Sequence, residues 1–540
     1  MPVCRTNPRT MPLRPTPFLR RGARVPVPCR SRRRSICSVM STSPATTHES
    51  FDPATDADWD ALRALGHRML DELLDAQRAL PHSPAWRPLP DAKRSLFDES
   101  GPRTGMGADA VYERFRTHVL PYGNGNWHPR FFGWVQGNGT PLAMLADMLA
   151  AGMNPHLAGF NQAPALVEQQ VIGWFAEWMG MPGASGLFVT GGTMANVHGL
   201  AAARFAASRQ RDHDVRTSGV QTWPGETMRA PLVFYGSSET HGWAYKAAEW
   251  LGLGRRAFRQ VPVTEDFTVR IDALEQLIAE DRAAGLEPFA IVGTAGTVNT
   301  GAVDDLQALA DVAARESLWF HVDGAFGALL ALAPSLRDRL RGMERADSIG
   351  FDLHKWGSMP FECACVLVRN ADLHEAAFRQ QAAYLGPMAR GVSAGGQRFN
   401  DRGLDLTRGF KALKVWMQLQ ADGVEKFGRI IEQNVRQVQR LVALIDSHAE
   451  LERLAPAPLN VVCFRYRPAD QSSSDAALDA LNTELLQRLQ EQGIATPSST
   501  IINGRFALRV AHVNHRTTLQ DIDDLAEAVV MIGRETHAAA

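Results

Sequence analysis

Short apolar runs and longer amphipathic stretches alternate along the chain from about residue 140 to residue 370. The short runs are typical of strands and the longer stretches of helices, because apolar residues recur at the spacing of each. This alternation favours a mostly parallel sheet with helices on both faces, whose functional groups collect at the carboxyl ends of the strands. The expected strands span 186–190, 231–235, 289–293, 318–322 and 363–368, and the expected helices span 164–179, 194–207, 271–284 and 306–315.

The segments on either side of this alternation predict further units. A helix is expected over 55–77, a proline-rich connector over 80–105, a mobile glycine-rich loop over 384–407 and one long helix over 410–448. After Pro456 we expect a smaller α+β unit, with strands near 460–466 and 505–512 and helices near 475–492 and 519–533. The chain is therefore divided into a head at 1–48, an N-terminal helical segment at 49–140, a large domain at 141–425 and a small C-terminal domain at 426–540.

The head is unusual in its charge, since residues 1–48 hold ten arginines and neither a lysine nor an acidic residue. We favour an extension that is either disordered or spurious, and in the spurious case translation starts at Met40. A transit-type segment is a second interpretation and a basic nucleic-acid arm a weaker third. The rest of the chain holds 47 basic and 58 acidic residues, a net charge of about −11. Such a balance does not indicate a protein that binds nucleic acid.

Cys363, Cys365 and Cys463 lie outside the head and predict reduced, buried thiols, because the sequence has neither a disulfide framework nor a four-cysteine zinc spacing. No apolar run reaches the length that spans a membrane. We therefore expect a cytoplasmic protein without a metal, a membrane or a nucleic-acid partner.

Lys355 and Asp323 are the two residues that most directly indicate a chemistry. Asp323 ends the apolar run 318–323, and Lys355 follows 32 residues later in the string FDLHKW at 351–356. A lysine amine forms a Schiff base with the aldehyde of pyridoxal phosphate, and a carboxylate beside the pyridine nitrogen favours its protonated form. A protonated ring draws electrons from the substrate α-carbon. Taken singly, a lysine in a loop is usually a solvated surface residue, and an aspartate after an apolar strand is often a helix cap or turn former.

Other residues at predicted strand ends complete this site. Gly192 and Thr193 stand where a strand runs into glycines and a helix, an arrangement that binds phosphate through unpaired N–H groups; the alternative is a turn that caps the helix. His241 can stack on a pyridine ring, although a lone histidine is more often a surface residue. The string TAGT at 294–297, ending in Thr297, offers hydroxyl and N–H groups or a simple turn. His354, next to Lys355, can reach phosphate or substrate.

An aromatic segment precedes the predicted sheet and contains Trp127, Phe132 and Trp134. These side chains suit one wall of a substrate pocket, and the edge of a packed core is an equally good interpretation.

Taken together, these strings resemble the group II pyridoxal-phosphate-dependent decarboxylases, which include aromatic-L-amino-acid and glutamate decarboxylases. The resemblance runs from about residue 55 to residue 535. Its markers are HPRFFGW at 128–134, PALVE at 164–168, GGTMAN at 191–196, THGWAYKAA at 240–248, GTVNTGAVD at 296–304, HVDGAFG at 321–327, DLHKW at 352–356 and RGFKALKVW at 408–416.

The resemblance implies a fold class and a partner. The fold is α/β, of the pyridoxal-phosphate fold type I, with a mostly parallel seven-stranded-type sheet between helices in the large domain and a small α+β C-terminal domain. The partner is a second copy of the chain, in a homodimer with sites at the interface.

The resemblance also implies a role for each site residue. Lys355 would carry the cofactor, Asp323 would pair with the pyridine nitrogen, and His241 would stack on the ring. Tyr384, by its distance after the lysine, would donate the proton after carbon dioxide leaves. Phosphate-side positions match Gly192, Thr193 and His354, with Ala325 and Asp352 nearby. From its place in TAGT, Thr297 is expected to join these cofactor-binding residues.

Three positions depart from the family pattern. Asp352 stands where animal relatives often carry asparagine, and its charge would repel phosphate unless a proton or cation intervenes. Val298 replaces a threonine, and Gly242 with Trp243 replaces small polar residues that often follow the stacking histidine.

We therefore expect decarboxylation of an L-amino acid to its amine and carbon dioxide through an external aldimine. The aromatic segment favours an aromatic substrate, and no arginine is clearly aimed at an acidic side chain. Two alternatives stay open. One keeps the cofactor but changes the reaction, to an aldehyde synthase, a transaminase or an aldolase. The other is a non-catalytic protein on the same fold.

Overall fold

The computed structural model describes residues 49–380, 388–395, 398–470 and 473–539. Contacts divide the chain into two units, Met1–Asp60 and Ala61–Ala540, so the boundary falls within the first helix, α1 (Asp56–Ala79). Both sheets belong to the second unit. The domain bounds expected from the sequence remain a prediction. Among the helices in these described ranges, none is both long and apolar enough to cross a membrane.

A seven-stranded sheet forms the centre of the second unit. Six of its strands run in one direction, and β8 is antiparallel to both of its neighbours. The mostly parallel α/β sheet predicted from the sequence is therefore confirmed. In spatial order the strands are β2 (Ser185–Val189), β8 (Ala364–Val368), β7 (Ser348–Asp352), β6 (Trp319–Asp323), β5 (Glu287–Thr294), β3 (Leu232–Ser237) and β4 (Phe258–Val261).

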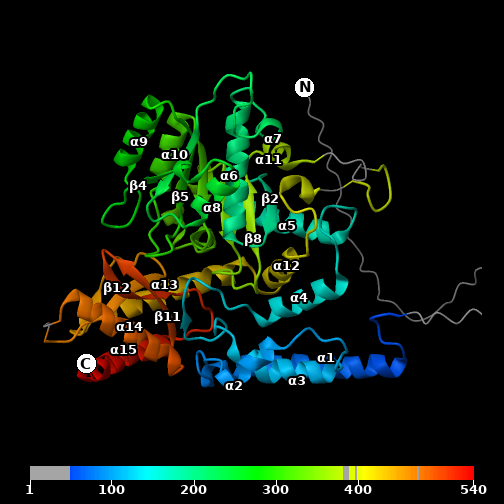
Figure 1. Cartoon of the computed structure of the whole chain (residues 1–540), viewed down its shortest axis with the longest axis vertical. Helices are drawn as coiled ribbons and strands as arrows, with labels where there is room; N and C mark the ends of the chain where they lie inside the picture. Colours follow the sequence, from blue (N-terminus) through cyan, green and yellow to red (C-terminus); the bar gives the residue numbers. More distant parts are fainter. Residues whose placement is uncertain (1–48, 381–387, 396–397, 471–472, 540) are drawn as a thin grey trace, which may run out of the picture. The chain divides into compact units, whose positions relative to one another are not determined.

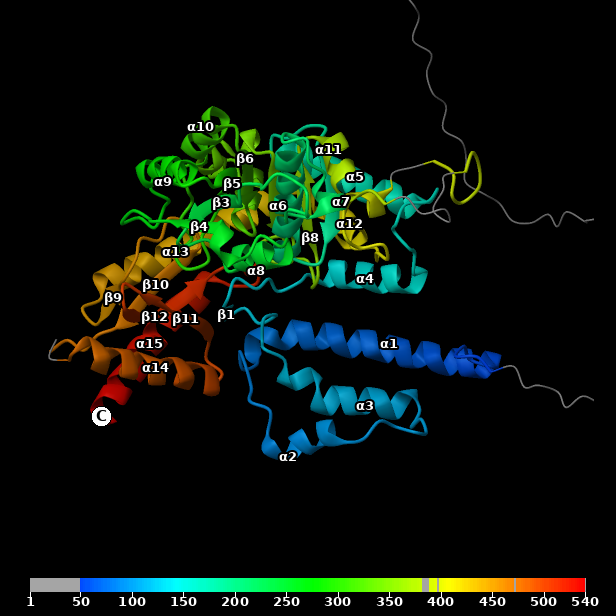
Figure 2. The same ribbon diagram turned by 45° about the horizontal axis from the view of Figure 1, so that its top comes forward.

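Helices cover both faces of this sheet because alternate strand residues point to opposite sides. Phe234 packs with α6 (Gly192–Arg209) and α8 (Trp243–Trp250), whereas its neighbour Tyr235 packs in the cluster that includes α9 (Ile271–Ala283) and α10 (Leu306–Glu316). In Figure 1 and Figure 2, α6 lies on one side of β5 and α9 and α10 on the other. Strands buried on both faces are almost continuously apolar, which is why most of them were predictable.

A smaller five-stranded sheet gathers segments from two distant parts of the chain. Its order is β1 (Phe131–Phe132), β11 (Thr496–Ile502), β12 (Arg505–Ala511), β10 (Val461–Tyr466) and β9 (Leu451–Arg453). β1 pairs in parallel with β11, and the other pairs are antiparallel. Apolar side chains of α13 (Val424–Ser447), α14 (Asp475–Glu491) and α15 (Leu519–Ala539) form one core with this sheet.

The described residues also form seven further α-helices. They are α2 (Asp91–Arg94), α3 (Ala108–His118), α4 (Pro141–Met153), α5 (Ala163–Trp178), α7 (Val215–Ser218), α11 (Ala371–Phe378) and α12 (Ala412–Asp422).

One expectation about these elements was wrong, and two strands of the large sheet were not predicted. The single long helix expected over 410–448 is two helices, α12 and α13, because Gly423 between them has φ 73°, a conformation that ends a helix and that glycine adopts without strain. The strands β4 and β7 were also missed. β7 carries a serine and a glycine, which have little strand propensity, and only its burial between β6 and β8 makes it a strand.

A buried ion pair holds strand β2 to the segments around it. The Arg408 guanidinium pairs with the Glu168 carboxylate of α5, and it also donates to the Leu157 carbonyl at 2.8 Å and the Phe188 carbonyl at 2.9 Å. The side chains of Arg408 and Glu168 are 4% and 0% exposed. These residues belong to the strings PALVE and RGFKALKVW, so two of the strings that carried the family resemblance are joined by one contact.

Replacing Arg408 with methionine should destabilise the protein by about 3–5 kcal/mol, because the Glu168 carboxylate is then buried without its partner. Urea unfolding followed by circular dichroism measures this change. The matched control is Arg429→Met, which removes an exposed pair with Glu425 whose side chains are 65% and 90% exposed. The control should lose at most about 1 kcal/mol. Equal losses in both variants would contradict a special role for the buried pair.

Candidate active site

The carboxyl ends of the parallel strands surround a cavity of about 370 Å³. This volume lies within the range of cofactor and small-molecule sites. Pairing between β5 and β6 places Thr294 opposite Asp323, and β7 ends at Asp352 one strand further along. The lining also takes residues from the start of α6, from the segment after β3 and from the segment after β7. Described residues that line it are Trp134, Val135, Thr190, Gly191, Gly192, Thr193, Met194, Asn196, His241, Trp243, Thr294, Gly296, Val298, Asp323, Ala325, Phe326, Asp352, His354, Lys355 and Glu362.

Lys355 lies in this cavity beside a buried carboxylate. Its Nζ is 2.8 Å from Asp352 Oδ2, and the two side chains are 23% and 2% exposed. The lysine is therefore accessible from the cavity, whereas the aspartate is covered by protein. From the sequence, the charge of Asp352 was expected to repel phosphate unless a proton or cation intervenes. The amine of Lys355 lies beside Asp352.

Asp323 is held by two donors. Trp243 Nε1–H donates to Oδ2 at 2.6 Å, and the Ala325 backbone N–H donates to Oδ1 at 3.2 Å. Asp323 is 3% exposed. Hydrogen bonds to both oxygens stabilise the buried carboxylate and fix the direction in which it faces the cavity.

The start of helix α6 offers an anion site. The helix begins at Gly192, and the N–H groups of its first turn have no partner within the helix, so they favour a negative group. A side chain at Gly192 would not fit, because its Cβ would lie 2.7 Å from Asp352 Oδ2. The close approach of helix and carboxylate therefore requires glycine at this position.

Two histidines of the lining each accept a backbone N–H through Nδ1. The Trp243 backbone N–H donates to His241 Nδ1 at 3.2 Å, and the Cys363 backbone N–H donates to His354 Nδ1 at 3.1 Å. Desolvation lowers the pKa of both histidines, which favours neutral rings at pH 7. In a neutral ring whose Nδ1 accepts, Nε2 carries the hydrogen. Each histidine is therefore set to donate through Nε2.

The structure brings most of the sequence-predicted residues together. Lys355, Asp323, His241, Gly192, Thr193, Ala325, Asp352, His354 and Trp134 all line the one cavity.

Three predicted residues lie elsewhere. The Thr297 hydroxyl accepts from the Ala302 backbone N–H at 3.1 Å, within the turn after β5. Phe132 is 0% exposed and packs in the core of the small sheet, because β1 pairs with β11. Trp127 is absent from the described lining of the cavity. For Phe132, the core interpretation that the sequence left open fits the structure better. Tyr384 lies outside the described residues.

Several lining residues were missed or undervalued by sequence reasoning. Thr294 lines the cavity in place of Thr297, and its position at the end of β5 was the available signal. Trp243 was noted only as a departure from the family pattern. Asn196, Phe326 and Glu362 had no distinguishing local signal, since each reaches the cavity only through the packing of separate segments.

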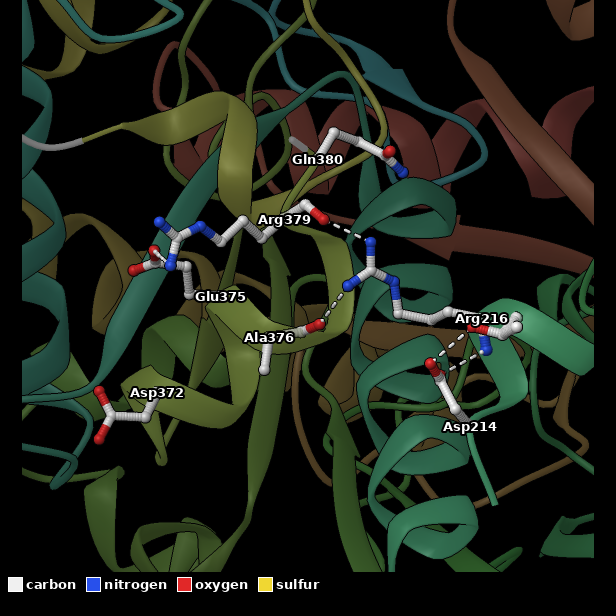
Figure 3. Close-up of a pocket in the computed structure, with 8 residues that line it drawn as sticks. Asp214, Arg216, Asp372, Glu375, Ala376, Arg379 and Gln380 are labelled. Carbon is white, nitrogen blue, oxygen red and sulfur yellow. Dashed lines mark hydrogen bonds and ion pairs between the residues drawn. The ribbon is translucent and has the colours of Figure 1, made fainter. Parts of the chain in front are cut away.

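A second, larger hollow of about 950 Å³ lies between α7 and α11. In Figure 3, Arg216 reaches across it toward the end of α11, where its guanidinium donates to the carbonyl of Ala376 at 2.7 Å and to that of Arg379. This contact satisfies carbonyls at a helix C-terminus. The described lining of this hollow contains neither lysine nor histidine, so it lacks an amine for an aldehyde cofactor.

The residues of the smaller cavity fit pyridoxal phosphate. The lining combines a lysine amine, a fixed carboxylate, a neutral histidine and a helix N-terminus, which match the aldehyde, the pyridine nitrogen, the ring face and the phosphate. Two buried polar atoms of the lining, Thr294 Oγ1 and Asp352 Oδ1, have no hydrogen-bond partner among the described residues. The cavity thus has unused polar capacity for a ligand.

Comparisons with known proteins agree with this fit. Residues 90–467 match the family model described as the pyridoxal-dependent decarboxylase conserved domain. An aromatic-L-amino-acid decarboxylase of Bacillus atrophaeus is 30% identical over 480 residues, which cover 88% of this chain and 96% of the relative. A phenylacetaldehyde synthase of Arabidopsis thaliana is 27% identical over 462 residues, covering 84% of this chain and 92% of that protein.

A solved structure gives the same result for the fold. The structure of Oryza sativa TDC with PLP and tryptamine superposes with a TM-score of 0.81 at 25% identity, and the match covers 90% of this chain and 99% of that one. The fold is therefore pyridoxal-phosphate fold type I, with pyridoxal 5′-phosphate as the cofactor. This chain belongs to the pyridoxal-dependent decarboxylases, the carboxy-lyases of amino acids.

Proposed function

We propose that the protein converts an aromatic L-amino acid to its amine and carbon dioxide. The observation that carries the choice of substrate is the charge of the cavity lining. Asp323, Asp352 and Glu362 are acidic, and Lys355 is the one lysine or arginine among the described lining residues. The carboxylates of the lining would therefore repel an acidic substrate side chain, and no arginine of the described lining could pair with it. Trp134, which is 54% exposed, presents an aromatic surface to the cavity instead.

The backbone at this tryptophan supports a functional role. Trp134 and Val135 have φ values of 51° and 58°, a conformation that side-chain-bearing residues rarely adopt. Consecutive residues of this kind are maintained only where surrounding structure holds them, and they cluster at binding sites.

The chemistry divides between the cofactor and the chain. When bound, pyridoxal 5′-phosphate supplies an electron sink for the electron pair left on the α-carbon as carbon dioxide departs. Lys355 supplies the amine for the cofactor aldehyde, and Asp323 places a negative charge at the cavity wall for the ring nitrogen. Gly192 and Thr193 offer N–H groups to phosphate. His241 would cover one face of the ring, and Tyr384, assigned from its sequence position, would return a proton to the α-carbon.

Lys355→Ala should abolish amine production, because no other described residue of the lining offers a primary amine. Borohydride treatment of the native protein should attach the cofactor to the peptide that contains Lys355, and mass spectrometry locates it. Lys426→Ala, at an exposed lysine paired with Asp422, is the matched control and should keep both activity and adduct. Near-normal amine release by Lys355→Ala, or an adduct on another lysine, would defeat this assignment.

A panel of amino acids assayed for released carbon dioxide tests the substrate. Tryptophan, tyrosine, phenylalanine and their hydroxylated forms should be the best substrates, and glutamate should be poor. Trp134→Ala should raise KM for the aromatic substrates about three- to tenfold, since an aromatic pair contributes about 0.5–1.5 kcal/mol. Preference for glutamate, or for a basic amino acid held by Glu362, would replace the aromatic proposal.

An aldehyde synthase is the second candidate, because one relative is a phenylacetaldehyde synthase. That reaction consumes oxygen and water and releases aldehyde, carbon dioxide, ammonia and hydrogen peroxide. Tyr384 favours the decarboxylase. Tyr384→Phe should slow amine release and admit this aldehyde chemistry, which an oxygen electrode and aldehyde analysis measure. An unchanged rate and product would remove Tyr384 from the mechanism, and peroxide from the native protein would favour the synthase.

We also propose a homodimer and a cytoplasmic location. The dimer is supported by exposed apolar side chains on neighbouring helices: Met148, Leu149 and Met153 of α4 and Leu166 of α5 are between 52% and 63% exposed. Exposed apolar side chains of this kind are typical of a protein interface.

A further inference from the structure

Trp243 contacts two of the groups that the cofactor needs. Its indole N–H donates to Asp323 Oδ2 at 2.6 Å, and its backbone N–H donates to His241 Nδ1 at 3.2 Å. One residue therefore orients both the carboxylate on the pyridine-nitrogen side and the imidazole on the ring face. Nothing in the chemistry of decarboxylation by itself requires a tryptophan at this position.

The indole is itself fixed by its surroundings. Trp243 is 1% exposed and begins helix α8. Its ring meets the His321 ring edge-on, with centroids 5.8 Å apart and an interplanar angle of 78°. His321 is in turn held by Ser348 at 2.8 Å and Asn196 at 3.1 Å. A rigid donor in a dry environment holds a carboxylate more firmly than a solvated one does.

The remaining partner of Asp323 is weaker. The Ala325 N–H lies 3.2 Å from Oδ1, in the short segment that follows β6, so it cannot alone fix the rotation of the carboxylate. Loss of the indole N–H would leave Oδ2 buried without its donor and free to turn.

We propose that Trp243 is a positioning residue that aims the Asp323 carboxylate at the cofactor ring nitrogen. This inference rests on the proposed role of Asp323. The hydrogen bond from Trp243 orients the Asp323 carboxylate, and this orientation sets how strongly the site binds the protonated ring. The indole N–H acts only through Asp323, so its contribution depends on the ring nitrogen of the ligand.

The test uses the cofactor-free full-length protein and two ligands, pyridoxal 5′-phosphate and its 1-deaza analogue, in which carbon replaces the ring nitrogen. Trp243→Phe should raise Kd for pyridoxal 5′-phosphate about tenfold, as expected for a lost hydrogen bond to a charged group. It should leave Kd for the deaza analogue unchanged, because that ring has no nitrogen for Asp323. Trp250→Phe, at the exposed far end of the same helix, is the matched control and should change neither Kd.

A second variant separates the N–H from packing. Site-specific replacement of Trp243 by 3-benzothienylalanine keeps the bicyclic shape and substitutes sulfur for the N–H, so it should reproduce the Trp243→Phe result with an unperturbed fold. An equal loss of affinity for both ligands would show that Trp243 acts through packing, and it would overturn the proposal. Unchanged affinity for both ligands would overturn it as well. The borohydride adduct at Lys355 reports separately on the proposed function. If every variant forms the adduct but none binds pyridoxal 5′-phosphate selectively more weakly, only the Trp243 inference is wrong. If the native protein forms no adduct at Lys355, both the inference and the proposed function are wrong.

Discussion

The balance of charge in one buried cavity is the constraint on which the site depends. Two carboxylates, Asp323 and Asp352, are covered by protein at the same edge of the sheet, and burying a charge without compensation is costly. Each is compensated differently. Asp352 faces Lys355 at 2.8 Å, whereas Asp323 is held by neutral N–H donors of Trp243 and Ala325. Lys355 is thus a cationic group beside Asp352, whereas the donors on Asp323 are neutral, which leaves Asp323 suited to a cationic ring.

Buried charges are also paired in the segments that surround the cavity. Arg408 and Glu168 neutralise each other inside the protein and tie β2 to α5 and to the segment before α12. β2 leads directly into Gly192 and the start of α6, so this pair supports the strand that presents the anion site. Buried polar groups thus serve two purposes in this molecule. Paired charges such as Arg408 and Glu168 stabilise the scaffold, and Asp323, which accepts from two N–H donors, is available to the ligand.

Much of the fold was predictable because the large sheet is buried on both faces. Continuous apolar runs predicted β2, β3, β5, β6 and β8 with bounds close to those observed. β7 escaped because Ser348 and Gly350 interrupt its pattern, although it delivers Asp352 to the site. The prediction of one long helix was wrong at Gly423, because the positive φ of a single glycine does not change the apolar periodicity of the sequence. β1 escaped because two residues form a strand only when a partner from the far end of the chain is present.

The sequence by itself determined the family, the fold class and the residues that can do chemistry, because these follow from local strings such as DLHKW and HVDGAFG. It could not decide which aromatic and hydroxyl side chains reach the cavity. Phe132 and Trp134 are two residues apart, yet one is in the core of the small sheet and the other on the cavity wall. Likewise Thr294 reaches the cavity and Thr297 does not. Only the tertiary structure settles such choices, since they depend on strand pairing and on turns that bring distant segments together. Trp243 is the clearest case: its indole meets Asp323 across 80 residues of sequence.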